Sequence, residues 1–253
     1  MELIIHKIVV LIPFRNARNF IIDCVNSIFN QLYTDYEIYL LDDASDDGTL
    51  DEIDEEVENL YKIKNEKRLT ALENLYHALI TLPINDEDIV AIIDGDDFLF
   101  GEYVFTMLNT KYNQKDILLT YGQYITNYGI LGHCIPYSME EFRNIRSMPW
   151  KASHLKTFKY KLFKQFLAVD PNVKNFKYEN GEFIKSAYDI AIMLPLLEIA
   201  GYNASYCFQN VLYCYRLHSN NDHATIMGKH TQLEAENCIR NKPAIQSKNS
   251  IIQ

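Results

Sequence analysis

The sequence predicts an α/β fold in which a doubly wound sheet carries helices on both faces. Three continuous apolar runs, 7–12, 36–41 and 89–93, predict buried strands. Segments with helical spacing lie between them, so strand and helix alternate as in right-handed βαβ units. A polar cluster follows each apolar run directly. Because ligands of such sheets bind beyond the carboxyl ends of the strands, we expect a ligand site there.

The other expected elements follow from periodicity and from turn residues. In the first half we expect helices over 19–31, 49–61 and 69–82 and a short strand over 61–65. In the second half we expect strands over 117–121, 124–135 and 211–217. Helices are expected over 154–166, over 188–200 with Gly201 as its C-cap, and in the polar tail before Pro243.

Composition excludes several classes of protein. A chain of 253 residues that is 48% hydrophobic can bury a sizeable core. Its net charge of -10 argues against binding nucleic acid or an anionic membrane non-specifically. We find no apolar run long enough for a membrane span or a signal peptide. Five cysteines without a CxxC pair favour free thiols in a reducing compartment, so we expect a cytoplasmic protein without integral membrane contact.

The strongest chemical signal is the acidic turn Asp94-Gly95-Asp96-Asp97, which follows the third apolar run. Hard divalent cations prefer oxygen ligands, and Mg²⁺ or Mn²⁺ typically takes one or two carboxylates together with phosphate oxygens. Crowded carboxylates would otherwise repel one another and resist ionisation. The turn therefore favours a cation site, and a plain Asp-Gly surface turn is the alternative.

A second acidic segment follows the second apolar run. Asp42 and Asp43 stand at the expected strand end, where we favour a role as hydrogen-bond acceptors for a base or a ribose. For residues 45–49 the main expected role is a turn and the start of a helix. The acidic residues from 51 to 58 are interpreted as a solvated helix face.

Four motifs occur in order over most of residues 8–99: IPFRNARNF, LLDDASDDGT, NEKRLTALENLYHAL and IIDGDDFL. Together they resemble the family 2 glycosyltransferases, which have the GT-A fold and transfer a sugar from a nucleotide-diphosphate sugar to an acceptor hydroxyl. The resemblance implies a hexosyltransferase that needs Mn²⁺ or Mg²⁺. A UDP-sugar is the favoured donor, and a GDP- or dTDP-sugar is possible. The acceptor is a glycan or another hydroxyl compound.

The resemblance also implies a domain organisation. Residues 1–227 would form a single GT-A domain, with a nucleotide-binding half over 1–100 and an acceptor-binding half over 101–227. Residues 228–253 would form a C-terminal helical extension. The oligomeric state is not readable from the sequence.

The resemblance assigns roles to particular residues. Asp94 and Asp96 match the family's DxD motif, in which Asp96 would bind the metal with help from Asp94, and Asp97 would support it. Thr70 departs from the family, because many relatives have glycine there. The residues of the nucleotide pocket would be Pro13, Arg15, Asn16, Asp42, Asp43, Arg68, Asp94 and Gly95.

The resemblance implies that Asp189 is the general base, since a carboxylate must take the proton of the acceptor hydroxyl as it attacks. The alternative is a first-turn acid that interacts with the helix dipole. Glu179 and Glu182 are reserve candidates. Inversion of the anomeric centre is the behaviour of the family.

Three further residues are candidates for contacts with the substrates. Trp150, the only tryptophan, either stacks on a sugar ring or packs as a core aromatic. His218 either ligates the metal or a phosphate, or is structural. Arg216 is expected to neutralise the leaving group.

Rival functions predict other motifs. A nucleotidyltransferase would usually have a glycine-rich basic loop after the first strand, and residues 14–18 contain no glycine. A catalytically inactive nucleotide-sugar-binding module is disfavoured by the intact acidic turn and by Asp189. A Rossmann oxidoreductase would need GxGxxG after the first strand, which is missing.

Overall fold

The computed structural model describes residues 3–54, 57–114, 116–219, 221 and 226–245. Within them, eight strands form one mixed sheet in the order β3-β2-β1-β4-β7-β6-β8-β5. The strands are β1 (Ile8–Phe14), β2 (Tyr36–Asp42), β3 (Leu60–Lys64), β4 (Ile89–Ile92), β5 (Phe98–Leu99), β6 (Leu119–Thr126), β7 (Lys156–Lys159) and β8 (Ser205–Tyr215). The α-helices are α1 (Ile21–Phe29), α2 (Ala71–Thr81), α3 (Val104–Tyr112), α4 (Met139–Arg143), α5 (Tyr160–Val169), α6 (Tyr188–Ala200) and α7 (Ile226–Arg240). The 3₁₀ helices are η1 (Thr49–Glu52), η2 (Ile145–Ser147), η3 (Lys174–Phe176) and η4 (Tyr202–Ala204).

The first half of the sheet is parallel. β1 pairs with β2 on one side and with β4 on the other, and β2 pairs with β3. Every residue of β1 is buried, because both faces of the strand are covered. Val9 and Leu11 belong to one core layer. Val10 and Ile12 belong to the other, as the alternation of side chains along a strand requires.

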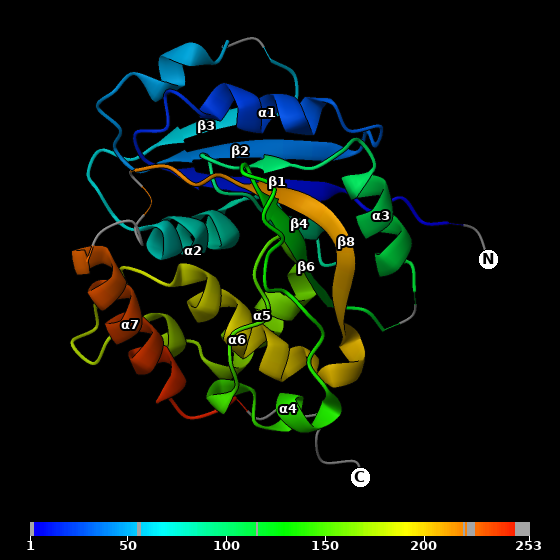
Figure 1. Cartoon of the computed structure of the whole chain (residues 1–253), viewed down its shortest axis with the longest axis vertical. Helices are drawn as coiled ribbons and strands as arrows, with labels where there is room; N and C mark the ends of the chain where they lie inside the picture. Colours follow the sequence, from blue (N-terminus) through cyan, green and yellow to red (C-terminus); the bar gives the residue numbers. More distant parts are fainter. Residues whose placement is uncertain (1–2, 55–56, 115, 220, 222–225, 246–253) are drawn as a thin grey trace.

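The helices divide between the two faces of the sheet (Figure 1). The core layer on one face contains buried residues of α1 and α3. The layer on the opposite face contains residues of α2, α5, α6 and α7. Helices therefore cover both faces, which confirms the predicted α/β, doubly wound class.

The second half makes the sheet mixed. β7 runs antiparallel to both β4 and β6, whereas β8 is parallel to β6 and β5 is antiparallel to β8. In Figure 1, β8 runs across the direction of β1 and β2, so the sheet is strongly twisted. The parallel and antiparallel halves meet where β4 pairs with β7.

Two predicted helices were wrong in part. The expected helix over 49–61 is only the short turn η1 in the described residues, and Thr49 is the one buried side chain of that turn. An acidic segment without a continuous apolar stripe cannot hold a helix on the core. The expected helix over 154–166 contains the strand β7 before α5 begins. Pairing with two neighbouring strands overrides the helical spacing of this segment.

Other boundaries also differ from the predictions. The strand expected over 211–217 begins already at Ser205, and β6 unites 119–121 with the start of the strand expected over 124–135. β5 and α3 were not predicted. The expected elements α1, α2, β3 and α6 are confirmed, and Gly201 closes α6 with a φ of 77°.

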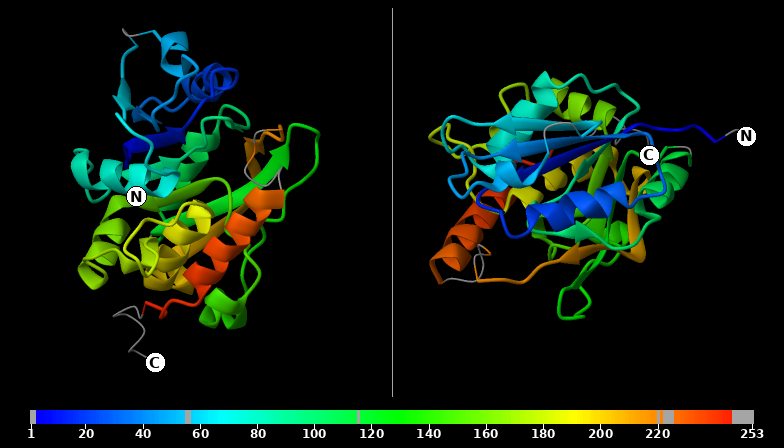
Figure 2. Two further views of the ribbon diagram at one scale, coloured as in Figure 1. Left: turned by 90° about the vertical axis from the view of Figure 1, so that its left-hand side faces the viewer. Right: turned by 90° about the horizontal axis from the view of Figure 1, so that it is seen from above.

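The predicted C-terminal helix is α7, which lies alongside α6 (Figure 2). Its Ala235 and Ile239 are buried in the same core layer as α6. The predicted boundary at residue 227 stays a prediction.

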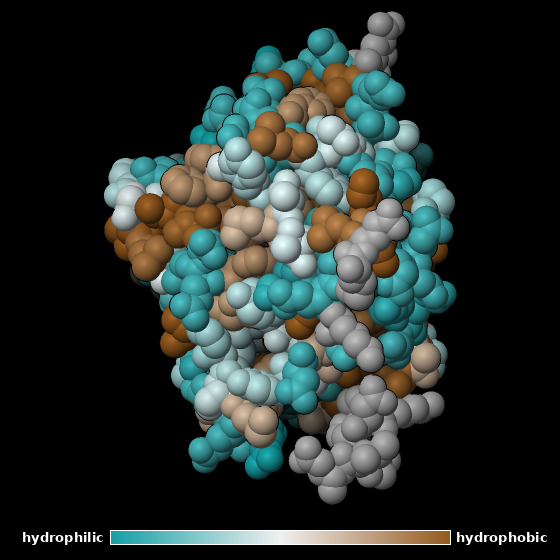
Figure 3. All heavy atoms as spheres, turned by 90° about the vertical axis from the view of Figure 1, so that its right-hand side faces the viewer, coloured by the Kyte–Doolittle hydropathy of each residue, from teal (hydrophilic) through white to brown (hydrophobic). Residues whose placement is uncertain are grey.

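One face of the molecule is largely hydrophilic. Figure 3 shows one face on which hydrophilic residues cover most of the area, with separate apolar areas between them. All five cysteines are free thiols, as predicted. Across the described ranges, the structure contains no helix with the length and apolarity that a membrane crossing requires.

Candidate active site

The predicted site lies at the edge of the sheet where β1, β2 and β4 end. The Asp43 amide donates to the Phe14 carbonyl at 2.9 Å, and the Gly95 amide donates to the Pro13 carbonyl at 3.3 Å. These bonds continue the strand pairing past the strand ends. They hold the three polar turns side by side, as the parallel topology predicted.

Asp42 and Asp43 shape the loops of the predicted nucleotide pocket. Both carboxylates are buried. Asp42 Oδ1 accepts a hydrogen bond from the Ser45 amide at 2.8 Å, and its Oδ2 has no hydrogen-bond partner in the described part of the chain. Asp43 Oδ1 accepts from the Leu69 amide at 2.7 Å. The buried Asp42 Oδ2 is thus an acceptor that a ligand donor can satisfy.

Arg15 and Asn16 join the turn after β1 to the turn after β2. Arg15 Nη1 donates to the carbonyls of Asp43 and Ala44, both at 2.9 Å. Asn16 Nδ2 donates to the Asp46 carboxylate at 2.8 Å, and Asn16 Oδ1 accepts from the Asp46 amide at 3.1 Å. Asn16 has a φ of 52°, which asparagine adopts more readily than most residues. Both residues therefore build the wall of the site.

A shallow pocket of about 440 Å³ opens beside the ends of β2 and β3. Arg68 lies just beyond it in the chain, is exposed, and forms no hydrogen bond or ion pair with the residues that the structure describes. Its guanidinium is thus open to an anionic ligand. The lining residues are Ala44, Ser45, Lys64, Asn65 and Glu66.

Pro13 and Gly95 bring β1 and the acidic turn into close contact. Pro13 is buried within β1. A Cβ atom on Gly95 would lie 2.5 Å from Phe14 Cβ, which no side chain can accept without movement. Gly95 therefore allows the acidic turn to lie directly against the end of β1.

The carboxylate of Asp94 is surrounded by protein partners. Its Oδ2 lies 3.2 Å from Lys156 Nζ, and its Oδ1 accepts a hydrogen bond from the Tyr188 hydroxyl. The ring of His154 lies 3.7 Å from the same Oδ2. Lys156 is fully buried, so its ammonium is an internal counter-ion of Asp94.

Asp96 faces a different partner. Its Oδ2 lies 2.9 Å from His218 Nε2, and its side chain is 32% exposed, more than that of Asp94. The ring of His218 packs on Phe20, with ring centroids 4.5 Å apart. The predicted pair of Asp96 and His218 is thus brought together, although the two residues are far apart in the sequence.

Asp97 points into the protein. It is fully buried, its Oδ1 accepts from the Arg216 amide at 2.7 Å, and its Oδ2 has no hydrogen-bond partner among the described residues. The Arg216 guanidinium pairs with Asp23 at 2.9 Å and lies over the rings of Phe20 and Phe98. These contacts hold the guanidinium against α1 and β5. A role of Arg216 at the leaving group stays a prediction.

The carboxylates of the turn have different pKa values because their surroundings differ. Burial and the charge of Asp94 raise the pKa of Asp96. Burial, with Asp96 and Asp94 close by, holds the pKa of Asp97 well above its usual range. Burial opposes the ionisation of Asp94 as well, but the Lys156 ammonium and the other partners outweigh it and lower the pKa of Asp94. Burial and Lys156 lower the pKa of His154 to about 3, so His154 is neutral and Lys156 supplies the positive charge.

Asp189 lies in the first turn of α6, directly after the backbone passes through Ala187 with a φ of 52°. Its Oδ2 accepts a hydrogen bond from Trp150 Nε1 at 3.1 Å. Burial raises the pKa of Asp189, against the opposing charge of Lys156. A carboxylate with a raised pKa is a stronger base than an ordinary one.

The two reserve candidates lie on the surface. Glu179 and Glu182 are exposed, and Glu182 pairs with Lys185, which is exposed as well. Trp150, in contrast, is partly buried against the core and uses its indole nitrogen on Asp189. Trp150 and Asp189 therefore form one unit, which the sequence analysis treated as two separate residues.

Two groups of side chains can be considered for a metal ion. Asp94, Asp97 and His154 bring one ligand atom each within 4.8 Å of one another. Lys156 Nζ already lies 3.2 Å from Asp94 and 3.3 Å from His154, so an ammonium occupies this group. The pair of Asp96 and His218 offers an oxygen and a nitrogen ligand at a more exposed position. The pair fits a divalent cation better than the buried group does.

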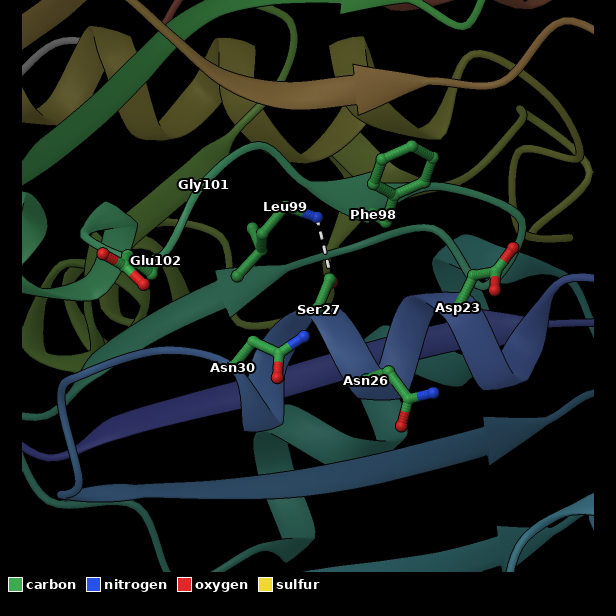
Figure 4. A pocket seen from close by; sticks show the side chains of 8 residues that line it. All are labelled: Asp23, Asn26, Ser27, Asn30, Phe98, Leu99, Gly101 and Glu102. Carbon is green, nitrogen blue, oxygen red and sulfur yellow. Dashed lines mark hydrogen bonds between the residues drawn. The ribbon is translucent and has the colours of Figure 1, made fainter.

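A larger pocket, of about 550 Å³, lies outside this site. It opens between α1 and β5 and contains none of the predicted site residues (Figure 4). Ser27 Oγ at its floor already accepts a hydrogen bond from the Leu99 amide at 3.0 Å. The other lining residues are Asp23, Asn26, Asn30, Phe98, Gly101 and Glu102.

Sequence reasoning missed Lys156, Tyr188 and His154. Both Lys156 and His154 lay in a segment that was expected to be a helix, and no motif marked Lys156. Tyr188 stands beside Asp189, so its neighbourhood was a usable signal. Only the pairing of β7 with β4 brings Lys156 to the acidic turn.

The comparisons with known proteins agree with this geometry. A family model described as "Glycosyl transferase family 2" matches residues 9–168. The poly(ribitol-phosphate) beta-glucosyltransferase of Bacillus spizizenii is 32% identical over 142 residues. The match covers 53% of this chain and 21% of that relative, so the chain spans about a fifth of the relative's length.

Solved structures show the same fold. S. aureus TarS matches with a TM-score of 0.63 at 17% identity, over 84% of this chain and 37% of TarS. TarS 1-349 in complex with UDP-GlcNAc matches with a TM-score of 0.63 at 20% identity, over 85% and 60% of the two chains. The mannosyltransferase PcManGT from Pyrobaculum calidifontis, in complex with GDP-Man and Mn²⁺, matches with a TM-score of 0.61 at 17% identity, over 94% and 66%. Since the family match covers more than half of the chain, the protein belongs to glycosyl transferase family 2 and is a glycosyltransferase with the GT-A fold.

Proposed function

We propose that the protein transfers a sugar from a nucleoside-diphosphate sugar to an acceptor hydroxyl, with a divalent cation and with inversion of the anomeric centre. The observation that carries the proposal is the acidic turn after β4. There Asp96 lies 2.9 Å from His218, and Asp94 accepts a hydrogen bond from Tyr188, which directly precedes the base candidate Asp189. The pocket beside β2 and β3 adds a place for the donor. The proposal joins them into one donor and acceptor site.

Asp96 and His218 would hold the cation. Their oxygen and nitrogen atoms lie 2.9 Å apart and suit Mn²⁺ or Mg²⁺. When bound, the cation supplies Lewis-acid stabilisation of the diphosphate. Nearby, Asp94 is already neutralised by Lys156, which reduces repulsion of an anionic donor.

The donor would occupy the pocket beside β2 and β3. Arg68 would approach a phosphate, and the unsatisfied Asp42 Oδ2 would accept a hydrogen bond from the nucleoside. We favour a UDP-sugar, supported by the UDP-GlcNAc complex of TarS. GDP- and dTDP-sugars remain alternatives, and PcManGT was solved with GDP-Man and Mn²⁺.

Asp189 would remove the proton from the acceptor hydroxyl. Trp150 orients this carboxylate, and burial raises its pKa, so it accepts a proton readily. Attack by the activated hydroxyl on the face opposite the leaving diphosphate inverts the anomeric carbon. Trp150 also presents an aromatic ring beside the base, where an acceptor sugar can stack.

The acceptor class and the setting belong to the proposal as well. We propose a glycan or a related polyol as the acceptor, because the curated relative is named for a poly(ribitol-phosphate) acceptor. Residues 1–227 would form the transferase domain, with donor and acceptor halves that meet near residue 100. Five free thiols support a reducing, cytoplasmic compartment.

The test is release of nucleoside diphosphate across a panel of UDP-, GDP- and dTDP-sugars. The panel includes poly(ribitol phosphate) and simple glycans as acceptors, with Mn²⁺ or with a chelator. We expect turnover of at least one donor with Mn²⁺, its loss on chelation, and its loss in Asp96→Asn. Turnover that survives both chelation and Asp96→Asn would remove the cation from the proposal. Binding of a nucleotide sugar without any transfer would favour the inactive binding module.

A further inference from the structure

We propose that Lys156 and Tyr188 are positioning residues that hold the first turn of α6, which carries the base Asp189, against Asp94. The inference rests on the proposed function and deepens it, because it concerns how the site keeps its geometry. Lys156 belongs to none of the four sequence motifs, and Tyr188 directly precedes the base candidate Asp189. Their role follows from contacts between three elements that are distant in the chain.

Lys156 is the centre of these contacts. Its Nζ lies 3.2 Å from Asp94 Oδ2, 2.8 Å from the Tyr188 hydroxyl and 3.3 Å from His154 Nδ1. The Tyr188 hydroxyl in turn donates to Asp94 Oδ1. Lys156 lies on β7, Tyr188 opens α6, and Asp94 follows β4. The Lys156 ammonium thus connects β7 to the first residue of α6 and to the acidic turn after β4.

A fully buried lysine needs a reason. Burying an ammonium is costly unless it is paired and hydrogen-bonded. Among the described residues, the hydrogen-bond and ion-pair partners of Lys156 all belong to this site, and Lys156 lies opposite Ile92 in the pairing of β4 with β7. An apolar residue at that position would have filled the core at lower cost. The presence of a charged residue at this buried position is therefore explained by its contacts with Asp94 and Tyr188.

The first turn of α6 depends on the contacts of Lys156 and Tyr188 with Asp94. No side chain caps the helix at Ala187, whose φ of 52° turns the chain sharply into the helix. Tyr188 is the first helical residue and Asp189 is the next. The Tyr188 hydroxyl, held by Lys156 and Asp94, thus anchors the turn from one side. Trp150 holds Asp189 from the other side at 3.1 Å.

Two variants test the contacts of Tyr188 and of Lys156 separately. Tyr188→Phe removes only the hydroxyl and keeps Lys156 on Asp94, so we expect kcat to fall on the order of 100-fold while the KM of the donor stays nearly constant. Lys156→Met removes the charge and should lower kcat at least as much. If the residues act as one unit, the double variant is no slower than Lys156→Met alone.

Lys159→Met is the matched control, because Lys159 is a buried lysine of the same strand that pairs with Glu87 at 2.7 Å. Its kcat should match the wild type.

A second readout does not depend on turnover. Trp150 is the only tryptophan, and its indole donates to Asp189, so its emission reports on the position of the base. We expect Tyr188→Phe and Lys156→Met to change this emission and its quenching by acrylamide. Lys159→Met should leave both unchanged. If the wild-type protein transfers no sugar, the proposed function fails, and the emission still decides the present inference.

Folded Tyr188→Phe with the kcat and the emission of the wild type would overturn the proposal. Additive losses in the double variant would do so too, because they would show that the two residues act independently. If Lys156→Met does not fold, Tyr188→Phe decides alone, since it removes one hydroxyl and keeps the ring in place.

Discussion

Asp189 and Trp150 show how one contact changes the interpretation of two residues. The indole N–H of Trp150 donates to the Asp189 carboxylate at 3.1 Å, so Trp150 has a polar contact with the base candidate in addition to its packing against the core. Asp189 in turn is not a free first-turn acid of α6. Its half-buried position and raised pKa fit a group that takes up a proton during turnover.

Replacement of this carboxylate should separate transfer from donor binding. We expect Asp189→Asn to transfer at least ~100-fold more slowly, the lower end of general-base contributions, and to bind the donor as the wild type does. Steady-state kcat and equilibrium binding of the nucleotide sugar measure the two effects. Glu182→Gln, a change at an exposed surface carboxylate, serves as the control and should transfer normally. A normal kcat in Asp189→Asn would return the role of base to another residue.

The pH profile should report the same carboxylate. Burial raises the pKa of Asp189, and the base must be ionised, so the rate should fall as the pH drops through that raised pKa. The Trp150 N–H stabilises the ionised form and therefore lowers the pKa. Trp150→Phe should therefore move the acid limb of kcat to higher pH, because the ionised form loses this hydrogen bond. An acid limb at the same pH in both proteins would contradict the assignment.

Among the elements, the turn after β4 is the one whose local conformation the site needs most. It must bring three carboxylates against the end of β1, and Gly95 makes the approach possible because a Cβ would lie 2.5 Å from Phe14 Cβ. Gly95 therefore has a packing role in addition to any contact with the nucleotide. Its backbone amide also completes the pairing to Pro13.

Gly95→Ala should be destabilising for this reason. We expect a loss of about 1–3 kcal/mol in the free energy of unfolding, the usual cost of overpacking, with a weaker affinity for the donor. Urea denaturation and nucleotide titration measure the two effects. Stability equal to that of the wild type would show that Phe14 moves aside at little cost, and the packing role would then be wrong.

On the scale of the whole molecule, one buried ion pair connects the second half of the chain. Arg146 and Glu198 lie 2.6 Å apart, with side chains only 10% and 7% exposed. Arg146 also donates to the Ile239 carbonyl in α7, and Glu198 belongs to α6. Arg240 returns a hydrogen bond to the Arg146 carbonyl at 2.8 Å. The pair thus fixes α7 on the body of the protein.

Replacing only one partner of the pair of Arg146 and Glu198 should lower the free energy of unfolding more than replacing both. Arg146→Leu leaves the Glu198 carboxylate buried without its cation, and such losses are typically about 3–5 kcal/mol. The double variant Arg146→Leu/Glu198→Leu should recover a large part of this loss, because neither charge remains. Urea denaturation of the two variants measures the difference. A double variant as unstable as Arg146→Leu would point instead to the lost contacts with α7.

An element was predictable from the sequence where it depends on interactions between residues that are close together in the chain. β1, β2, β4, α1, α2 and α6 were predictable because their apolar patterns are local and continuous. β7 was not, since its residues form a strand only when β4 and β6 lie on either side. The acidic turn and Asp189 were recognisable from the motifs and the family resemblance. Lys156 was not, because a lysine in an unmarked segment carries no sign of burial.

The sequence by itself determined the α/β class, the carboxyl ends of the strands as the place of the candidate site, and the resemblance to the family. Those conclusions depend on residues that are close together in the chain. Only the tertiary structure decided which partner each carboxylate received: Lys156 for Asp94, His218 for Asp96 and Trp150 for Asp189. The physical reason is that burial and charge pairing are set by groups from other elements. A linear sequence does not show which groups the antiparallel half of the sheet brings to the acidic turn.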